Sequence, residues 1–101
     1  MSDRISREDL EKIYKIELQF FDELVEYGLL KTQTENEIHY VLYEELPAFE
    51  RFANWHYDLE VNMPGLEIIH ELLQKLEQAN ADKRSLLQKL NAISDKYEDA
   101  D

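Results

Sequence analysis

The sequence contains no cysteine, only two glycines and only two prolines in 101 residues. Without cysteine, the chain can form neither a disulfide nor a zinc site with thiolate ligands. With two glycines, it lacks the glycine-rich loops that hold phosphate groups in nucleotide-binding proteins. No apolar run approaches the roughly 18 residues of a membrane-spanning helix, and none of signal-peptide length follows the N-terminus. We therefore expect a soluble protein of the cytoplasm.

Positive charge is scarce as well. The 11 Lys and Arg residues face 23 Asp and Glu residues, which gives a formal net charge of −12. Residues 1–62 hold 15 acidic and six basic side chains, and residues 63–101 hold eight and five. Such acidity disfavours binding to nucleic acid or to an anionic membrane and favours cationic surfaces, although it also serves solubility alone.

The chain does contain enough apolar material for a folded domain, because 44% of its residues are hydrophobic and 11% aromatic. A first helix is expected to begin at Ser6, whose hydroxyl can accept a hydrogen bond from the amide of Asp9. Ile5 is expected to pack on Leu10 across this cap. Apolar residues then recur at helical spacing, namely Leu10, Ile13 and Tyr14.

A second helix is predicted over residues 17–27. Gly28 would end it, because glycine most easily adopts the left-handed conformation past a helix end. Leu29 and Leu30 follow directly, so the chain is expected to turn back into the core. The apolar stripe of the helix consists of Leu18, Phe21, Leu24 and Val25.

A β-hairpin is predicted next. Residues 38–43 alternate with the period of a strand, and a polar turn at residues 35–37 separates them from residues 32–34. Two helices followed by such a hairpin are typical of a winged helix-turn-helix, which we place at residues 5–42. Domains of this kind usually bind DNA.

A third helix is predicted to begin at Glu44 or Glu45, and Pro47 is tolerable there because it falls in the first turn. Together with the preceding elements, this helix completes a domain at residues 1–62. Its buried stripe is expected to consist of Leu46, Phe49, Ala53 and Tyr57, flanked by Phe52 and Trp55.

A long C-terminal helix is predicted at residues 63–101. Asn62 can cap it and Pro64 fits its first turn, while residues 79–82 are a possible break into two shorter helices. A heptad-like seam follows it in steps of three and four residues. The seam comprises Ile69, Leu72, Leu76, Ala79, Lys83, Leu86, Leu90, Ile93 and Tyr97. We expect a dimer or partner-helix contact, rather than a fold-back, through Leu86, Leu90, Ile93 and Tyr97.

The second helix occupies the position that faces phosphates in DNA-binding winged helices, yet it contains no Lys or Arg. Because proteins hold DNA mainly with these two residues, an acidic helix would repel it. We predict a basic protein partner instead. Phe20 and Trp55 lie at the margins of their apolar stripes, and an exposed aromatic ring among acids would suit a basic groove. The predicted partner-binding residues are Glu17, Phe20, Glu23 and Glu26.

No catalytic, cofactor or metal site is predicted. Glu67 and His70 match half of the Glu-x-x-His pattern of di-iron bundles, but the second copy is absent. His39 and His56 have no partner at metal-ligand spacing, so we expect a surface or half-buried role for both. The protein is therefore not expected to be an enzyme.

Four segments resemble the chaperone-modulatory proteins of the CbpM type, which share the MerR-like winged helix. They are residues 23–30, residues 40–43, residues 51–55 and the junction Asp58-Leu59-Glu60-Val61-Asn62-Met63-Pro64-Gly65-Leu66. The likeness covers nearly the whole chain in order and spacing. It implies a mainly α fold: a MerR-like winged helix-turn-helix with a small β-hairpin wing, followed by a long C-terminal helix.

The resemblance also implies a function. Proteins of this type bind the J-domain of a DnaJ-like co-chaperone (CbpA type) and inhibit its stimulation of Hsp70. J-domains generally present a basic helix, which suits an acidic competitor. The partner-contacting residues of the family do not follow from any motif here, so the assignment to the second helix rests on charge alone.

Two alternatives stay open. The first is a MerR-like DNA-binding transcriptional regulator, although those proteins carry a cationic-aromatic run where this chain has residues 18–21, and bases where its wing has Glu35 and Glu37. The second is a structural dimerisation module built on the long helix. DNA binding would need either membership of a larger DNA complex or a local basic edge, for which the candidates are Arg4, Arg7, Lys12, Lys15 and Lys31.

Overall fold

The computed structural model describes residues 3–98, with side chains up to residue 94. The described residues form two compact units, and the division lies between Ile68 and Ile69. The fold is mainly helical with a small three-stranded sheet and a long C-terminal helix, as predicted. The elements are β1 (Arg4–Ser6), α1 (Arg7–Tyr14), α2 (Leu18–Glu26), β2 (Gln33–Glu35), β3 (Ile38–Leu42), the 3₁₀ turn η1 (Tyr43–Glu45), α3 (Leu46–Leu59) and α4 (Met63–Glu98).

Residues next to the ends of the first two helices explain where these helices begin and end. Ser6 caps α1, accepting a hydrogen bond from the amide of Asp9 at 3.2 Å, as predicted. Lys15 follows this helix in the left-handed conformation with φ 54°. Past the end of α2, Gly28 has φ +74°, which is the conformation expected of it.

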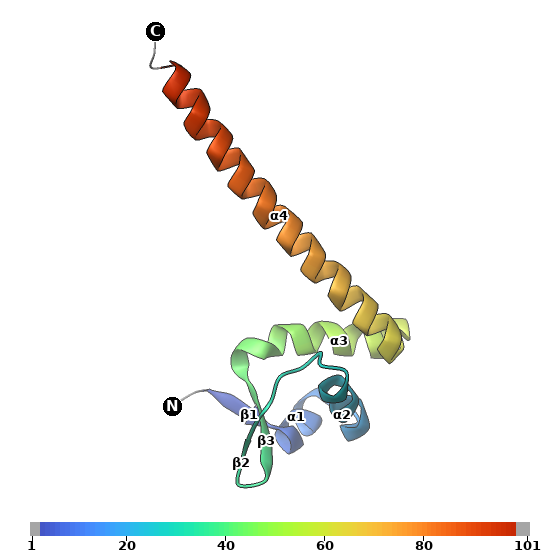
Figure 1. Ribbon diagram of the computed structural model, residues 1–101. Helices are drawn as coiled ribbons and strands as arrows, with labels where there is room; N and C mark the ends of the chain where they lie inside the picture. The colour runs from blue at the N-terminus through green and yellow to red at the C-terminus, as the bar shows by residue number, and fades with distance from the viewer. Residues whose placement is uncertain (1–2, 99–101) are drawn as a thin grey trace. The chain divides into compact units, whose positions relative to one another are not determined.

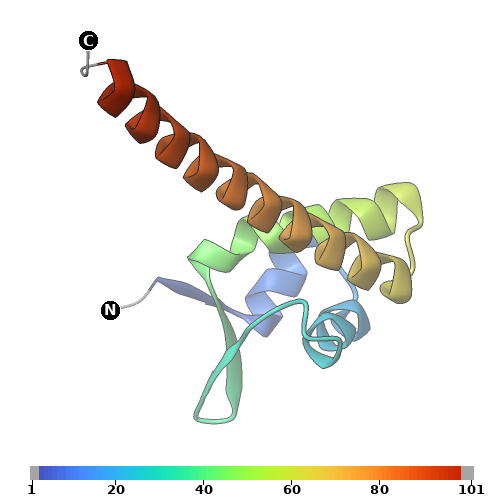
Figure 2. The ribbon, with the colours of Figure 1, turned by 45° about the horizontal axis from the view of Figure 1, so that its top comes forward.

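The sheet is antiparallel with the strand order β1-β3-β2. The predicted hairpin is present, and a two-residue turn of Asn36 and Glu37 joins its strands, both residues having positive φ. Figures 1 and 2 show this turn at the end of the sheet away from α3. Strand β1, which pairs Ile5 with Val41, was not expected from the sequence.

One apolar core holds the first unit together. Every member is at most 9% exposed, and the sheet contributes Val41 to it. Three residues expected to be buried are exposed instead, namely Ile13 at 64%, Val25 at 36% and Tyr57 at 41%. The core residues are Leu10, Ile16, Phe20, Phe21, Leu24, Leu29, Leu30, Val41, Phe49, Phe52, Ala53, Met63 and Leu66.

The junction between α3 and α4 is tightly built. His56 donates from Nδ1 to the carbonyl oxygen of Val61 at 2.8 Å, and Asn62 caps α4 by accepting from the amide of Gly65 at 2.9 Å. A Cβ atom on Gly65 would lie only 2.8 Å from Cγ1 of Val61. Because this first turn of α4 buries Leu66, it belongs to the first unit.

Helix α4 is continuous for 36 residues, so the alternative of a break at residues 79–82 is wrong. Figure 1 draws it as one unbroken ribbon. Within the second unit, no side chain among residues 69–94 is buried. A search of the described residues finds no helix whose length and apolar content would let it cross a membrane.

Candidate protein-binding surface

The acidic residues predicted to bind a partner do not share a single face of α2. Glu23 and Glu26 lie three positions apart and so occupy one side of the helix. Glu23 accepts a hydrogen bond from Gln19 at 3.1 Å, which fixes its carboxylate on that side. Glu17 precedes the helix, and its amide donates to the hydroxyl of Tyr57 in α3 at 3.0 Å. The structure therefore brings Glu23 and Glu26 together but not Glu17.

Phe20 is a core residue, and the expectation that its ring is exposed is wrong. Only 3% of its surface is exposed. The ring stacks on His56 at 4.6 Å between centroids and meets Tyr57 edge-on at 5.2 Å. Helical spacing alone could not show that Phe20 is buried between α2 and α3. Phe20 lies at the edge of the apolar stripe of α2, and whether such a residue is buried depends on how the neighbouring helix packs. Trp55 is half-buried and packs against the core, with its ring 6.1 Å from that of Phe52.

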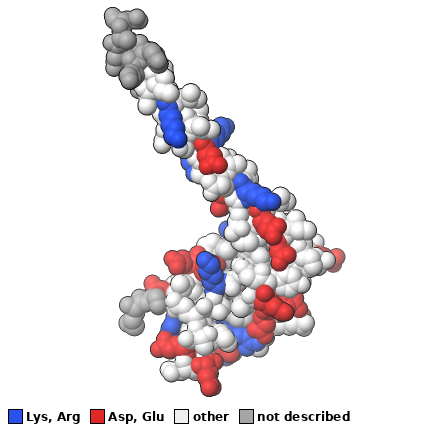
Figure 3. Space-filling model, viewed as in Figure 1, with Lys and Arg blue, Asp and Glu red and all other residues white. Residues whose placement is uncertain are grey.

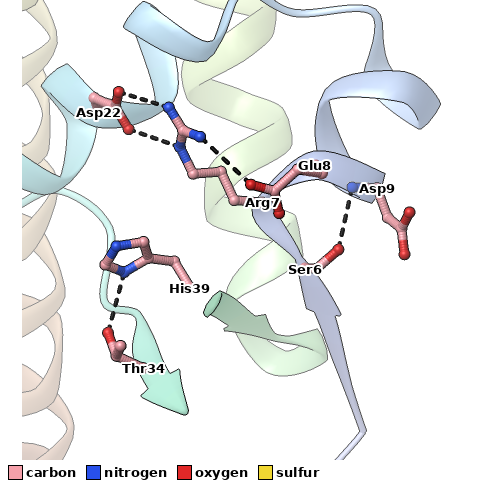
Figure 4. Close-up of polar contacts among 7 residues, drawn as sticks. All are labelled: Ser6, Arg7, Glu8, Asp9, Asp22, Thr34 and His39. Carbon is pink, nitrogen blue, oxygen red and sulfur yellow. Dashed lines mark hydrogen bonds and ion pairs between the residues drawn. The ribbon is translucent and has the colours of Figure 1, made fainter. Parts of the chain in front are cut away.

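Arg7, at the start of α1, forms ion pairs with acidic side chains of the protein and is therefore not available to bind an external anion such as phosphate. Its guanidinium donates two hydrogen bonds to Asp22 of α2, at 2.9 and 2.8 Å (Figure 4). A third nitrogen lies 3.6 Å from Glu8. The bond to Asp22 raises the pKa of Arg7, against the opposing effect of burial. Arg7 thus joins the two helices and neutralises one carboxylate on α2.

Arg4 of β1 is engaged in the same way. It forms an ion pair with Glu35 of the hairpin and lies over the ring of Tyr40 at 3.9 Å. Two of the five cations proposed as a basic edge are therefore paired with acids, while Lys12, Lys15 and Lys31 are exposed. Figure 3 shows separate blue patches bordered by red on the face in view, without a continuous cationic stripe.

A second polar contact joins α1 to α3. The hydroxyl of Tyr14 donates to Glu50 at 2.6 Å, and its ring meets Phe49 edge-on at 5.2 Å. The hydrogen bond to the carboxylate raises the pKa of Tyr14 to about 12, with burial as the second cause. This contact orients α1 on the core and lies beside a shallow hollow that Lys15, Asn54 and Asp58 also line.

Three exposed apolar side chains were missed as surface candidates. They are Ile13 of α1, Ile38 of β3 and Tyr43 of η1, and all three line one hollow. The sequence placed Ile13 in a buried stripe, because its spacing from Leu10 is that of a helix face. Helix α1 has only eight residues, so the spacing of its apolar residues is not enough to predict which side of the helix is buried.

The seam predicted along α4 is exposed in the second unit. Leu86 is 59% exposed, Leu90 60% and Ile93 51%. Tyr97, the fourth residue predicted for dimer packing, has its side chain outside the described residues. Large aliphatic side chains repeating on one side of a helix are typical of a contact with another helix.

Metal ligation is not indicated in the part of the chain that the structure describes. Among those residues, no group of three or more His, Asp or Glu side chains is arranged to hold a metal ion. His39 lies in the hairpin, its Nδ1 atom 3.0 Å from the hydroxyl of Thr34 (Figure 4).

Comparison with known proteins agrees with the winged arrangement. No curated protein and no solved structure matches the chain. A family model described as MerR HTH family regulatory protein matches residues 5–88, which include both helices, the hairpin, α3 and most of α4. The match covers well over half of the sequence, and the chain therefore belongs to the MerR HTH family of regulatory proteins.

Proposed function

We propose that this protein is a cytoplasmic chaperone modulator that binds the J-domain of a DnaJ-like (CbpA-type) co-chaperone and inhibits its stimulation of Hsp70. The resemblance to CbpM-type proteins in the sequence is consistent with the family match. In this role, the acidic surface of the first unit meets the basic helix of the J-domain. It thereby competes with Hsp70 for that helix.

The pairing of Arg4 and Arg7 with acids is the observation that carries this proposal. These cations lie beside the wing and α2, where a DNA-binding winged helix needs free positive charge. Their pairing leaves Glu23 and Glu26 on α2 without a neutralising arginine among the ion pairs described. Complementary charge raises the rate of encounter with a basic partner and selects against acidic ones.

A calorimetric titration of the full chain with the J-domain of a co-chaperone tests the proposal. We expect binding at roughly micromolar strength or better, weakened by salt because surface charges are screened within about 8–10 Å at physiological ionic strength. An Hsp70 ATPase assay stimulated by the J-domain should be inhibited over the same concentration range. Absence of binding at low salt would falsify the proposal.

DNA binding is the second candidate, and membership of the MerR HTH family favours it. A gel-shift titration with duplex DNA distinguishes the two candidates. Retention of DNA at moderate salt would support a transcriptional regulator, because the exposed Lys12, Lys15 and Lys31 would then supply the phosphate contacts. A protein that binds the J-domain but no duplex is a modulator.

We also propose that two copies associate through α4. Leu86, Leu90 and Ile93 are more than half exposed, and a dimer would cover them. The third candidate function, a structural dimerisation module, would retain this contact but bind neither J-domain nor DNA. The two titrations above therefore separate all three candidates.

A further inference from the structure

A hollow of about 590 Å³ lies between α1 and the sheet in the first unit. It is separate from the acidic side of α2. Its apolar lining comes from Ile13 on α1 and, further along the chain, from Ile38 on β3 and Tyr43 on η1. Ile5 and the half-buried Tyr40 complete the apolar part. We call this the α1–sheet groove.

The groove exposes more apolar surface than an isolated side chain would. Ile13 is 64% exposed, Tyr43 53% and Ile38 40%. Scattered apolar residues on a surface need no explanation, but apolar side chains that converge in a hollow mark an interaction site. Few residues dominate the affinity of most protein interfaces, and they are apolar or aromatic anchors seated in such hollows.

Charged side chains of both signs line the groove. Glu8, Asp9 and Lys12 come from α1, and Arg4 comes from β1. Arg4 is already paired with Glu35 and stacked on Tyr40, so its charge is taken up within the protein.

A separate hollow of about 310 Å³ adjoins the groove at Tyr43. It shares Tyr43 and adds two carboxylates, Asp3 and Glu44. The two hollows together are lined by four carboxylates, of which Glu8 pairs with Arg7, and by two cations, of which Arg4 pairs with Glu35. Three carboxylates and one lysine are left outside the ion pairs described. An apolar floor with a predominantly acidic rim is complementary to an amphipathic segment that carries Lys or Arg.

We infer that the α1–sheet groove is the docking site for an amphipathic basic segment of the J-domain. Apolar side chains of that segment cover Ile13, Ile38 and Tyr43, and its cations face the acidic rim. The inference rests on the proposed function and names the surface that carries most of the affinity. It also supplies the apolar anchor site that the buried Phe20 cannot provide. The carboxylates of α2 then act on the rate of encounter rather than on the lifetime of the complex.

A matched pair of substitutions in the full chain tests this docking site. Ile13→Asn removes an apolar side chain of the groove, while Leu59→Asn removes one that is equally exposed, at 67%, and lies outside it. Neither substitution changes the net charge, so the long-range electrostatic attraction to the J-domain is the same for both variants. We expect Ile13→Asn to weaken J-domain binding by about tenfold or more, mainly through faster dissociation. Leu59→Asn should stay within about twofold of the parent chain.

The outcomes separate the inference from the proposed function. If the parent chain binds and Ile13→Asn binds equally well, the groove is overturned and the modulator proposal stands. If both variants weaken binding alike while thermal unfolding is unchanged, the groove has no special role and is again overturned. If the parent chain does not bind the J-domain, both the groove inference and the modulator proposal are wrong. Should Ile13→Asn alter only self-association in sedimentation, a second copy of this chain occupies the groove and the inference is wrong.

A variant that fails to fold would mimic lost binding, so a second substitution guards the test. Tyr43→Ser removes a 53% exposed ring from the other end of the groove. Circular dichroism and thermal unfolding identify which variants retain the fold. Loss of J-domain binding in folded Tyr43→Ser supports the site, and unchanged binding overturns it.

Discussion

Arg7 and Asp22 join the first two helices of the winged domain through two parallel hydrogen bonds of 2.9 and 2.8 Å. A DNA-binding surface needs cations that are free to contact phosphate. Here the charge of Arg7 is balanced by Asp22, and the planar guanidinium and carboxylate fix the two helices against each other. The pair therefore has a structural role and also removes positive charge from the surface.

This pair predicts a small but measurable effect on stability. Arg7→Gln or Asp22→Asn should lower the free energy of unfolding by about 0.5–1 kcal/mol, because Asp22 is more than half exposed and solvent screens the interaction. Chemical denaturation of both single variants and the double variant measures the coupling. Arg51→Gln, which changes an exposed cation of α3, is the control. A coupling energy of zero would contradict the prediction.

Tyr14 predicts a loss of stability at alkaline pH. Its pKa in the folded protein is about 12, above the ordinary value of 10.0, so the folded state holds the proton more tightly than the unfolded state. The stabilisation is complete below about pH 10 and is lost as the pH rises towards about 12. The unfolding free energy of Tyr14→Phe should fall less steeply across this window. Spectroscopic titration should show a late-titrating tyrosine in the parent chain that is missing from the variant.

Glu23 and Glu26 predict an effect on association rate. Changing both to Lys should slow association with the J-domain by on the order of tenfold at low salt and leave dissociation little changed. The control is Glu71→Lys with Glu77→Lys on α4, which changes the net charge by the same amount. Stopped-flow measurements at two salt concentrations compare them. Equal association rates for the two double variants would show that this side of α2 does not attract the J-domain.

The exposed seam of α4 predicts a dimer that one charge disrupts. Leu90→Asp places a carboxylate in the seam, whereas Gln88→Asp places it on the opposite side of the helix. Sedimentation at tens of micromolar should show a dimer for the parent chain and for Gln88→Asp, and a monomer for Leu90→Asp. A monomeric parent chain would eliminate the dimer.

Local features of the fold were predictable because the residues that determine them are neighbours in the sequence. The caps at Ser6 and Asn62 and the left-handed Gly28 depend on contacts within three or four residues. The strand β1 was not predictable in the same way. It has three residues, too few to show alternation, and its partner Val41 lies 36 positions away from Ile5.

The candidate site was less predictable than the fold. Spacing along a helix groups residues, but the tertiary packing decides which group faces the core. Phe20 therefore turned out buried and Ile13 exposed. The separation of Glu17 from Glu26 was already implicit in the helical repeat, since nine residues amount to two and a half turns. The pairing of Arg7 with Asp22 required the structure, because fifteen residues and an interhelical turn separate them.

The hairpin turn has one further consequence. Asn36 and Glu37 both adopt positive φ, at 52° and 66°, where glycine is the usual second residue of such a turn. Glu37→Gly should relieve about 1 kcal/mol of backbone strain. The tip of the wing thus keeps an acidic residue in a strained backbone conformation, so one substitution there changes both the melting temperature and the electrostatic potential of the wing.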